Sequence, residues 1–228
     1  ALGAAASSTA AHSLQDAGMV RLITGIVFPV GLVMVVILGA ELFTGNALMV
    51  NAALEKKITW GRLLRNWVIV YVGNFIGAIV VAAAFAFFGQ LDIGGGALAV
   101  YTAKIAVSKS SLDWANAFVL GIFCNLLVCI AVYIGSGTKD MAGKILGLYL
   151  PIFAFVIAGF EHCVANMYYI PAGIVAYMNP DYMTLIMQAG NNTEVLNFGT
   201  FALANLVPGT RGNIVGGVAV GCLVYVGH

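Results

Sequence analysis

Long apolar segments separated by short polar stretches dominate the chain. A helix needs roughly 20 apolar residues to cross a bilayer. Apolar runs of that length or more cover residues 19–50, 63–88, 114–134, 145–178 and 198–226. A shorter run, 2–11, has the character of part of a further span. The pattern predicts an all-α integral membrane protein with five full spans and one partial span.

Two of these runs, 19–50 and 145–178, are too long for one simple span and are interrupted by polar residues. Lipid tolerates non-helical backbone only where protein or a water-filled cavity satisfies it. We therefore expect the second and fifth spans to be broken helices that face each other near the middle of the membrane. Free N–H groups and helix dipoles at such breaks favour an anion.

Composition agrees with a lipid environment. Of 228 residues, 61% are hydrophobic and 8% are charged, against about 25% charged in a soluble domain. The mean hydropathy is +0.99. The net charge is +1 and there is no basic run, which argues against nucleic acid as a partner. The four cysteines lie in apolar stretches without a Cys-x-x-Cys motif, so we expect neither a disulfide framework nor a metal site.

Positive charge gathers in two of the connections between spans. Lys56, Lys57, Arg62 and Arg65 follow the second span, and Lys139 and Lys144 follow the fourth, whereas 179–197 has no Lys or Arg. By the positive-inside rule, these two connections and both chain ends face the cytoplasm. The region between the third and fourth spans is a balanced loop, with Asp92 and Asp113 against Lys104 and Lys109.

The interrupted spans share a pattern that indicates an internal repeat. Gly39, Glu41 and Asn46 align with Gly159, Glu161 and Asn166, and Asn66 with Gly73-Asn74-x-x-Gly77 aligns with Asn205 and Gly212-Asn213-x-x-Gly216. An odd number of spans separates the copies, so the halves have opposite orientations in the membrane. We predict one transmembrane domain, 1–228, formed by an inverted three-plus-three repeat with halves of about 1–110 and 111–228. The N-terminal part of its first helix is expected to be missing.

The polar residues of the breaks are the candidate functional groups. Charged side chains at the membrane centre cost roughly 2.5–3.5 kcal/mol each, so Glu41 and Glu161 need partners. We expect them to stabilise the loops by accepting hydrogen bonds from the free N–H groups of their own segments. The alternative, that they line the path and titrate, would repel anions. The other alternative, that polar residues only hold helices together, fits Asn74 and Asn213 better than the breaks.

His162 is the one ionisable group in the breaks that can become positive. A lone histidine on an apolar face is more often a structural core residue, but within a broken membrane helix a functional role is favoured. Thr44 occupies nearly the corresponding place in the other half. Its hydroxyl can donate to His162 or to a passing solute.

Short motifs in and after the interrupted runs are specific. The first half carries Glu41-Leu-Phe-Thr44-Gly-Asn46, Ile58-Thr-Trp-Gly61, Asn66-Trp and Gly73-Asn74-x-x-Gly77. The second half carries Gly159-Phe-Glu-His162-x-x-Ala-Asn166-Met and Ile170-Pro171-x-Gly173. With these motifs, the chain from about Ser13 to its end resembles the formate/nitrite transporter family, which includes hydrosulfide channels.

That resemblance implies a specific architecture and pore. It implies six helices in an aquaporin-like arrangement, assembled as a homopentamer in the inner (cytoplasmic) membrane of a prokaryote, with one pore in each protomer. The second helix would break near 32–44 and the fifth just before His162. Apolar constrictions would fall on Phe28, Leu32, Phe43 and Phe155. The central polar pair would be Thr44 and His162, with Asn125 and Asn166 nearby.

The predicted function is passage of small monovalent anions of weak acids, with or without a proton. Formate, nitrite and hydrosulfide all remain candidates. Lys104 and Lys109 are candidates for gathering anions at the outer mouth, although solvated surface charge is the alternative interpretation.

The motifs of two other classes of protein differ from those of this chain. An aquaporin-like channel for water or small neutral solutes would carry Asn-Pro-Ala at both breaks, but these read Thr44-Gly45-Asn46 and Val164-Ala165-Asn166. An enzyme would need a nucleophile or a metal cluster, and a single histidine with two carboxylates provides neither. We expect no catalytic residues, no metal and no cofactor.

Overall fold

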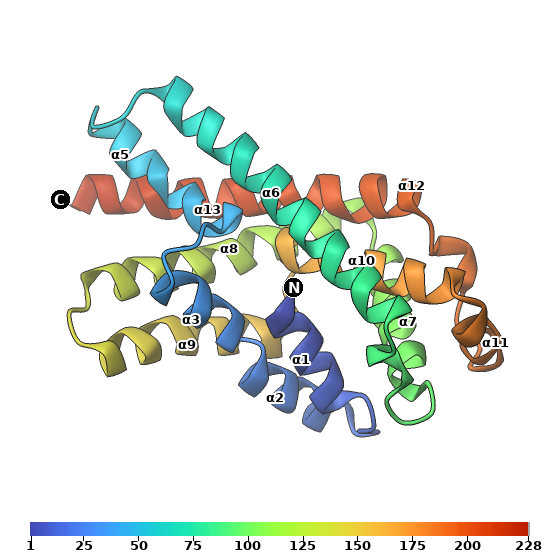
Figure 1. Ribbon diagram of the computed structural model, residues 1–228. Coiled ribbons are helices and arrows are strands. Elements are labelled where there is room, and N and C mark those ends of the chain that lie inside the picture. The colour runs from blue at the N-terminus through green and yellow to red at the C-terminus, as the bar shows by residue number, and fades with distance from the viewer. Residues whose placement is uncertain (228) are drawn as a thin grey trace.

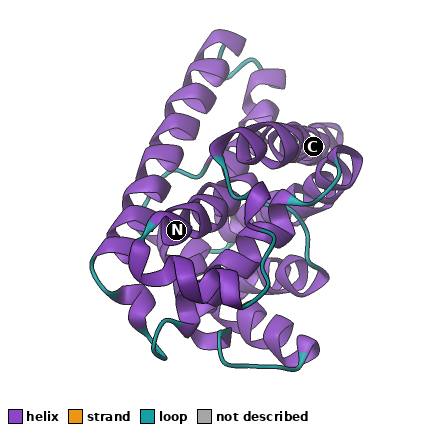
Figure 2. Cartoon of the chain, turned by 90° about the vertical axis from the view of Figure 1, so that its right-hand side faces the viewer, coloured by secondary structure: helices purple, strands orange, loops and turns teal. Residues whose placement is uncertain are grey.

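The computed structural model describes residues 1–227 as a set of helices, and His228 lies outside the described part. Figure 2 shows these helices joined by short loops. The first half comprises α1 Leu2–Ala11, α2 Ala17–Val27, α3 Val30–Ile37, α4 Phe43–Asn46, α5 Val50–Leu54, α6 Trp60–Phe87 and α7 Ala97–Ser110. The second comprises α8 Trp114–Gly137, α9 Met141–Ala158, α10 Cys163–Met178, α11 Pro180–Gln188, α12 Phe198–Thr200 and α13 Val207–Gly227. Single 3₁₀ turns cover Ala47–Met49, Gln90–Asp92 and Thr193–Val195, and a π-helical segment covers Phe201–Leu206.

The membrane spans agree with the hydropathy pattern. Within residues 1–227, five helical segments are long and apolar enough to cross a membrane, namely Ala17–Ile37, Trp60–Phe87, Trp114–Gly137, Met141–Ala158 and Phe198–Gly227. The run 145–178 divides into α9 and the shorter apolar helix α10. The run 19–50 divides into α2 and α3, then α4 and α5. Both long runs are therefore broken, as their polar interruptions predict.

Polar side chains mark where most of the long helices begin. Asp16, Thr59, Asp113 and Asp140 each accept a hydrogen bond from a backbone N–H in the first turn of α2, α6, α8 and α9. Such caps satisfy donors that have no partner within the helix. Short polar connections thus end one span and start the next.

The helices are arranged with the predicted basic connections at one end (Figure 1). The α5–α6 connection, the α8–α9 connection and the C-terminal end of α13 lie at the left of the view, while α11 lies at the right. Helix α8 packs against α13 and α9, and α10 packs against α6 and α7. The connections after the second and fourth spans therefore share one side, as the charge pattern predicts.

One expectation about the region between the third and fourth spans was wrong. Most of it is helix α7, not a loop. Its buried face carries Ala99, Ala103 and Ala106 at helical spacing, and it lies so close to α10 that a Cβ on Gly173 would be 2.3 Å from that of Ala106. Two lysines on the same segment obscured this small-residue stripe in the sequence. The stripe was the signal that could have identified the helix.

Glycines bring α8 and α13 into close contact. A Cβ on Gly212 would lie 2.1 Å from the carbonyl oxygen of Phe118, and one on Gly216 would lie 2.2 Å from that of Ile122. Real Cβ atoms do not approach backbone oxygen so closely, so these positions require glycine. The repeated Gly-Asn motif of the second half therefore packs the last helix directly on α8, beside the second break.

Candidate functional site

Both breaks begin with a glycine in the left-handed region of backbone space. Gly39, after α3, has φ +68°, and Gly159, after α9, has φ +76°. Glycine reaches this conformation without the steric cost that a Cβ adds. The chain then reaches Leu42 and His162, which have extended backbone and directly precede α4 and α10. The aligned glycines of the repeat thus end two helices in the same way.

In the first break, amide side chains hold the start of α4. The Phe43 N–H donates to Asn74 Oδ1 at 3.0 Å, and Asn74 Nδ2 donates to the carbonyl oxygen of Glu41 at 3.1 Å. Asn46 Nδ2 donates to the Glu41 carboxylate and, at 2.8 Å, to Asn66 Oδ1. Asn74 of α6 and Asn46 of α4 thus hold the loop that joins α3 to α4.

The second break repeats these hydrogen bonds with the aligned residues. The Cys163 N–H donates to Asn213 Oδ1 at 2.8 Å, and Asn213 Nδ2 donates to the carbonyl oxygen of Glu161 at 2.9 Å. Asn166 Nδ2 donates to Glu161 Oε2 at 2.5 Å and to Asn205 Oδ1 at 2.7 Å. The sequence repeat is therefore a repeat of one hydrogen-bond network.

This network corrects two expectations. The donors to the Glu41 and Glu161 carboxylates are side-chain amides and a lysine, not the free backbone N–H groups of their own segments. Asn74 and Asn213 do hold helices together, but they do so at the breaks, where each accepts the first N–H of a half-helix. An amide can donate and accept at once, which a carboxylate cannot.

Thr44 and His162 meet between the breaks. Thr44 Oγ1 lies 2.8 Å from His162 Nε2, and the Ala165 N–H donates to His162 Nδ1 at 3.0 Å. Because Nδ1 accepts a hydrogen bond, the neutral ring carries its proton on Nε2 and donates it to Thr44. Both side chains are buried, and the imidazole stacks on Phe155 with ring centroids 5.8 Å apart. The Thr44 hydroxyl proton remains able to bind a second acceptor.

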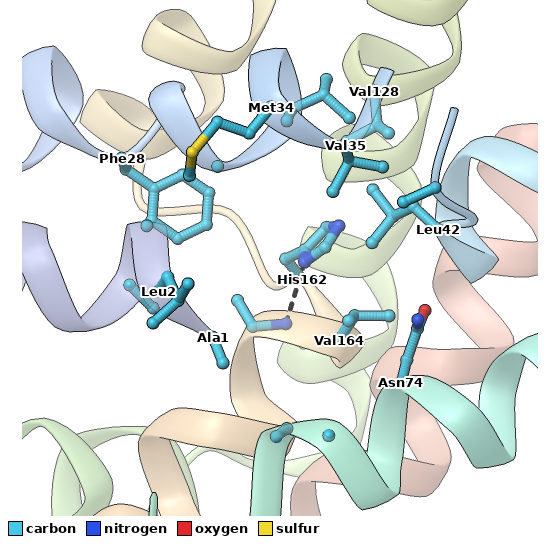
Figure 3. A pocket seen from close by; sticks show the side chains of 18 of the residues that line it. Ala1, Leu2, Phe28, Met34, Val35, Leu42, Asn74, Val128, His162 and Val164 are labelled. Carbon is cyan, nitrogen blue, oxygen red and sulfur yellow. Dashed lines mark hydrogen bonds between the residues drawn. The ribbon is translucent and has the colours of Figure 1, made fainter. Parts of the chain in front are cut away.

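A cavity of about 400 Å³ opens beside His162 (Figure 3). Its wall is mainly apolar and includes Phe28, Leu32 and Phe155, together with the first-break residues Glu41 and Asn74. Figure 3 shows the His162 imidazole pointing among apolar side chains that come from different helices. A few polar groups in the wall of an apolar cavity are a common arrangement for binding a small ligand.

The structure separates the predicted pore residues into two groups. The first group, which lines the cavity, comprises Phe28, Leu32, Phe155 and His162. Thr44 does not line the cavity but is hydrogen-bonded to His162, which does. Phe43, Asn125 and Asn166 lie outside its wall. Phe43 packs against the rings of Tyr71 and Trp67, Asn125 donates to the carbonyl oxygen of Asn213 at 2.7 Å, and Asn166 belongs to the second break.

The two candidate lysines of α7 have different environments. Lys109 Nζ lies 2.7 Å from Glu161 Oε1 and 5.8 Å from the centroid of the Tyr169 ring. Lys104 is exposed. Lys109 is therefore the cation of the second break and not a solvated surface charge, an ion pair that sequence reasoning missed because α7 was taken for a loop. Neither lysine lines the cavity.

Comparisons with known proteins agree with this geometry. Residues 1–227 match the family described as Formate/nitrite transporter. The formate channel FocA of Haemophilus influenzae is 41% identical over 202 residues, which cover 88% of this chain and 71% of that protein. FocA of Escherichia coli K12 is 36% identical over 221 residues, covering 96% of this chain and 78% of the relative. A solved structure described as a pentameric formate channel with formate bound superimposes with a TM-score of 0.85 at 35% identity, covering 99% of this chain and 91% of the other. The chain belongs to the formate/nitrite transporter family.

Proposed function

We propose that this chain conducts small monovalent anions of weak acids, with formate as the principal substrate, along a path between its two broken helices. The observation that carries the proposal is that His162, which is hydrogen-bonded to Thr44, lines a mainly apolar cavity. Relatives that bear the name formate channel support formate as the substrate. Nitrite and hydrosulfide share its charge and weak-acid character and are the alternatives to test.

The apolar wall of the cavity makes entry of an anion unfavourable unless Thr44 and His162 compensate for its lost hydration. An isolated anion between Phe28, Leu32 and Phe155 would lose its hydration without compensation. His162 can offer a hydrogen-bond donor from Nε2, and Thr44 can offer its hydroxyl. Two routes lower the barrier, and both require a protonated His162, whose Nδ1 must first release the Ala165 N–H. The imidazolium pairs with the anion, or it transfers its proton so that the neutral acid crosses the apolar rings.

We further propose that the chain assembles as a homopentamer in the cytoplasmic membrane, with its basic connections and both chain ends in the cytoplasm. The pentameric assembly of the similar solved structure supports this. The long helix α6 exposes Leu64, Val68, Ile69, Val72, Ile76 and Val80. Such an apolar surface requires lipid or a neighbouring subunit to cover it.

Flux into proteoliposomes tests the proposed function. Formate, nitrite and hydrosulfide are supplied separately at two pH values, with and without a pH gradient, and osmotic water flux is measured in the same vesicles. We expect protein-dependent formate flux that changes with pH. Water flux without anion flux would overturn the proposal in favour of a neutral-solute channel.

A substitution at the polar pair sharpens this test. His162→Phe keeps an aromatic ring beside Phe155 but removes both nitrogens, so we expect formate flux to fall and to lose its pH dependence. His12→Phe is the matched control, because His12 lies at the end of α1 and bonds to the Thr9 carbonyl oxygen at 2.7 Å. Unchanged flux and pH dependence in the His162 variant would exclude the proposed mechanism.

A further inference from the structure

A hydrogen bond joins the two repeats at a pair of aligned residues. Tyr71 Oη lies 3.0 Å from Thr210 Oγ1. Tyr71 precedes Asn74 by one turn of α6, and Thr210 precedes Asn213 by one turn of α13, so each pair lies on one helix face. The bond therefore connects the two turns that carry the break-holding asparagines. Figure 1 shows α6 and α13 crossing in the middle of the molecule.

This bond completes a continuous connection between the starts of the two half-helices. On one side, the Phe43 N–H is held by Asn74, and the Tyr71 ring packs on the Phe43 ring with centroids 4.8 Å apart. On the other side, the Cys163 N–H is held by Asn213. Phe43 precedes Thr44 and Cys163 follows His162 in sequence. The positions of the two polar side chains are thus linked through Tyr71 and Thr210.

We propose that Tyr71 and Thr210 form a clamp that sets the separation of Thr44 and His162 and so limits the size of the anion that passes. The inference rests on the proposed function. Both are positioning residues, because neither lines the cavity. Their effect on a solute acts through the half-helices that they join.

The packing explains why this one bond matters. Helices α6 and α13 share few other contacts, while each packs extensively on a different partner, α6 on α10 and α13 on α8. Without the clamp, each asparagine still holds its own half-helix, and α13 still packs on α4, Ala47–Met49 and α5 of the first half. What is lost is the direct polar link between the turns that carry Asn74 and Asn213. We then expect the 2.8 Å distance between Thr44 Oγ1 and His162 Nε2 to lengthen more readily, so that a larger solute can pass between the two side chains.

The test compares acetate with formate, which differ by one methyl group. Tyr71→Phe keeps the ring on Phe43 and removes the hydroxyl, and Thr210→Val removes the other partner. In each variant we expect the acetate-to-formate flux ratio in proteoliposomes to rise by about tenfold, the discrimination that one methyl group commonly carries. Thr210→Ser keeps a hydroxyl and should retain the wild-type ratio. The double variant should resemble Thr210→Val, because that substitution already removes the bond that Tyr71→Phe removes.

Tyr182→Phe is the matched control, since the Tyr182 hydroxyl donates to Asp92 Oδ1 at 2.6 Å, away from the breaks. It should leave the ratio unchanged. An unchanged ratio in Thr210→Val, an equal loss of both fluxes, or additive effects in the double variant would overturn the clamp. If Tyr71→Phe does not fold, the Val and Ser variants of Thr210 decide. If vesicles with the wild-type protein show no formate flux, the proposed function itself is refuted. If they conduct formate but the variants leave the acetate-to-formate flux ratio unchanged, only the clamp is refuted.

Discussion

The two breaks have the same backbone design but different surroundings. At the first, the exposed Glu41 carboxylate lies on the cavity wall and accepts a hydrogen bond from the neutral amide of Asn46. At the second, Glu161 is 3% exposed and pairs with Lys109 while two asparagine amides donate to it. A carboxylate that water reaches needs no cation, whereas a buried one does.

The aligned glycines differ in the same sense. A Cβ on Gly73 or Gly77 would meet nothing within 4 Å, whereas one on Gly212 or Gly216 would collide with a backbone carbonyl of α8. Gly73 and Gly77 line the cavity. The two copies of the repeat therefore differ in packing: the second break is packed closely against α8, whereas the first borders the cavity and is less tightly packed.

The largest expected change in the free energy of unfolding tests the difference in burial between Glu161 and Glu41. Lys109→Met leaves Glu161 buried without its cation, so we expect a loss of about 3–5 kcal/mol in the free energy of unfolding. Denaturant titration in detergent micelles measures it. Lys104→Met is the control, because Lys104 is exposed and surface changes are usually within about 0.5 kcal/mol. Equal effects of the two substitutions would contradict the comparison.

The second effect separates the glycines. Gly212→Ala forces α13 away from the Phe118 carbonyl oxygen, and we expect overpacking to cost about 3 kcal/mol. Gly73→Ala adds a methyl group to open space, so its helix should be unchanged or more stable by about 0.5–1 kcal/mol. The same titration compares them. A destabilised Gly73→Ala protein would contradict the open space that the structure shows beside Gly73 on α6.

The third effect separates the asparagines. Asn213 makes hydrogen bonds to Cys163, Glu161 and Gly121 in a fully buried position, whereas Asn74 makes two bonds in a half-buried one. We expect Asn213→Ala to destabilise the protein by about 2 kcal/mol more than Asn74→Ala, because buried partners left unsatisfied are costly. Unfolding of the two variants side by side measures the difference. Equal losses in the free energy of unfolding would contradict the predicted difference between the two breaks.

The smallest effect concerns Glu41. Glu41→Gln keeps the shape of an exposed side chain, so the free energy of unfolding should change by less than about 0.5 kcal/mol. Removing a negative charge from the cavity wall should raise formate flux by about twofold, the effect of one charge roughly 10 Å away in water. Glu194→Gln, an exposed carboxylate on another connection, should change neither. A lower flux in the Glu41 variant would assign its carboxylate a direct role in passage.

Much of the site was predictable because its signals are local. Polar residues inside apolar runs marked both breaks, and the aligned Gly, Glu and Asn residues predicted two similar loops. Thr44 and His162 were expected to face each other, and Thr44 Oγ1 lies 2.8 Å from His162 Nε2. The ion pair of Lys109 with Glu161 was not predictable in the same way, because it depends on how α7 packs against α10.

The sequence by itself determined the lipid environment, the number of spans, the two breaks and their repeat, because span length and polar interruption are properties of the chain read in order. Only the tertiary structure decided that α7 is a helix with one buried face, that Phe43 lies off the cavity, and that Glu161 is paired with a lysine while Glu41 is exposed. These outcomes depend on which helix faces come together. The same motif therefore has a different environment in each half.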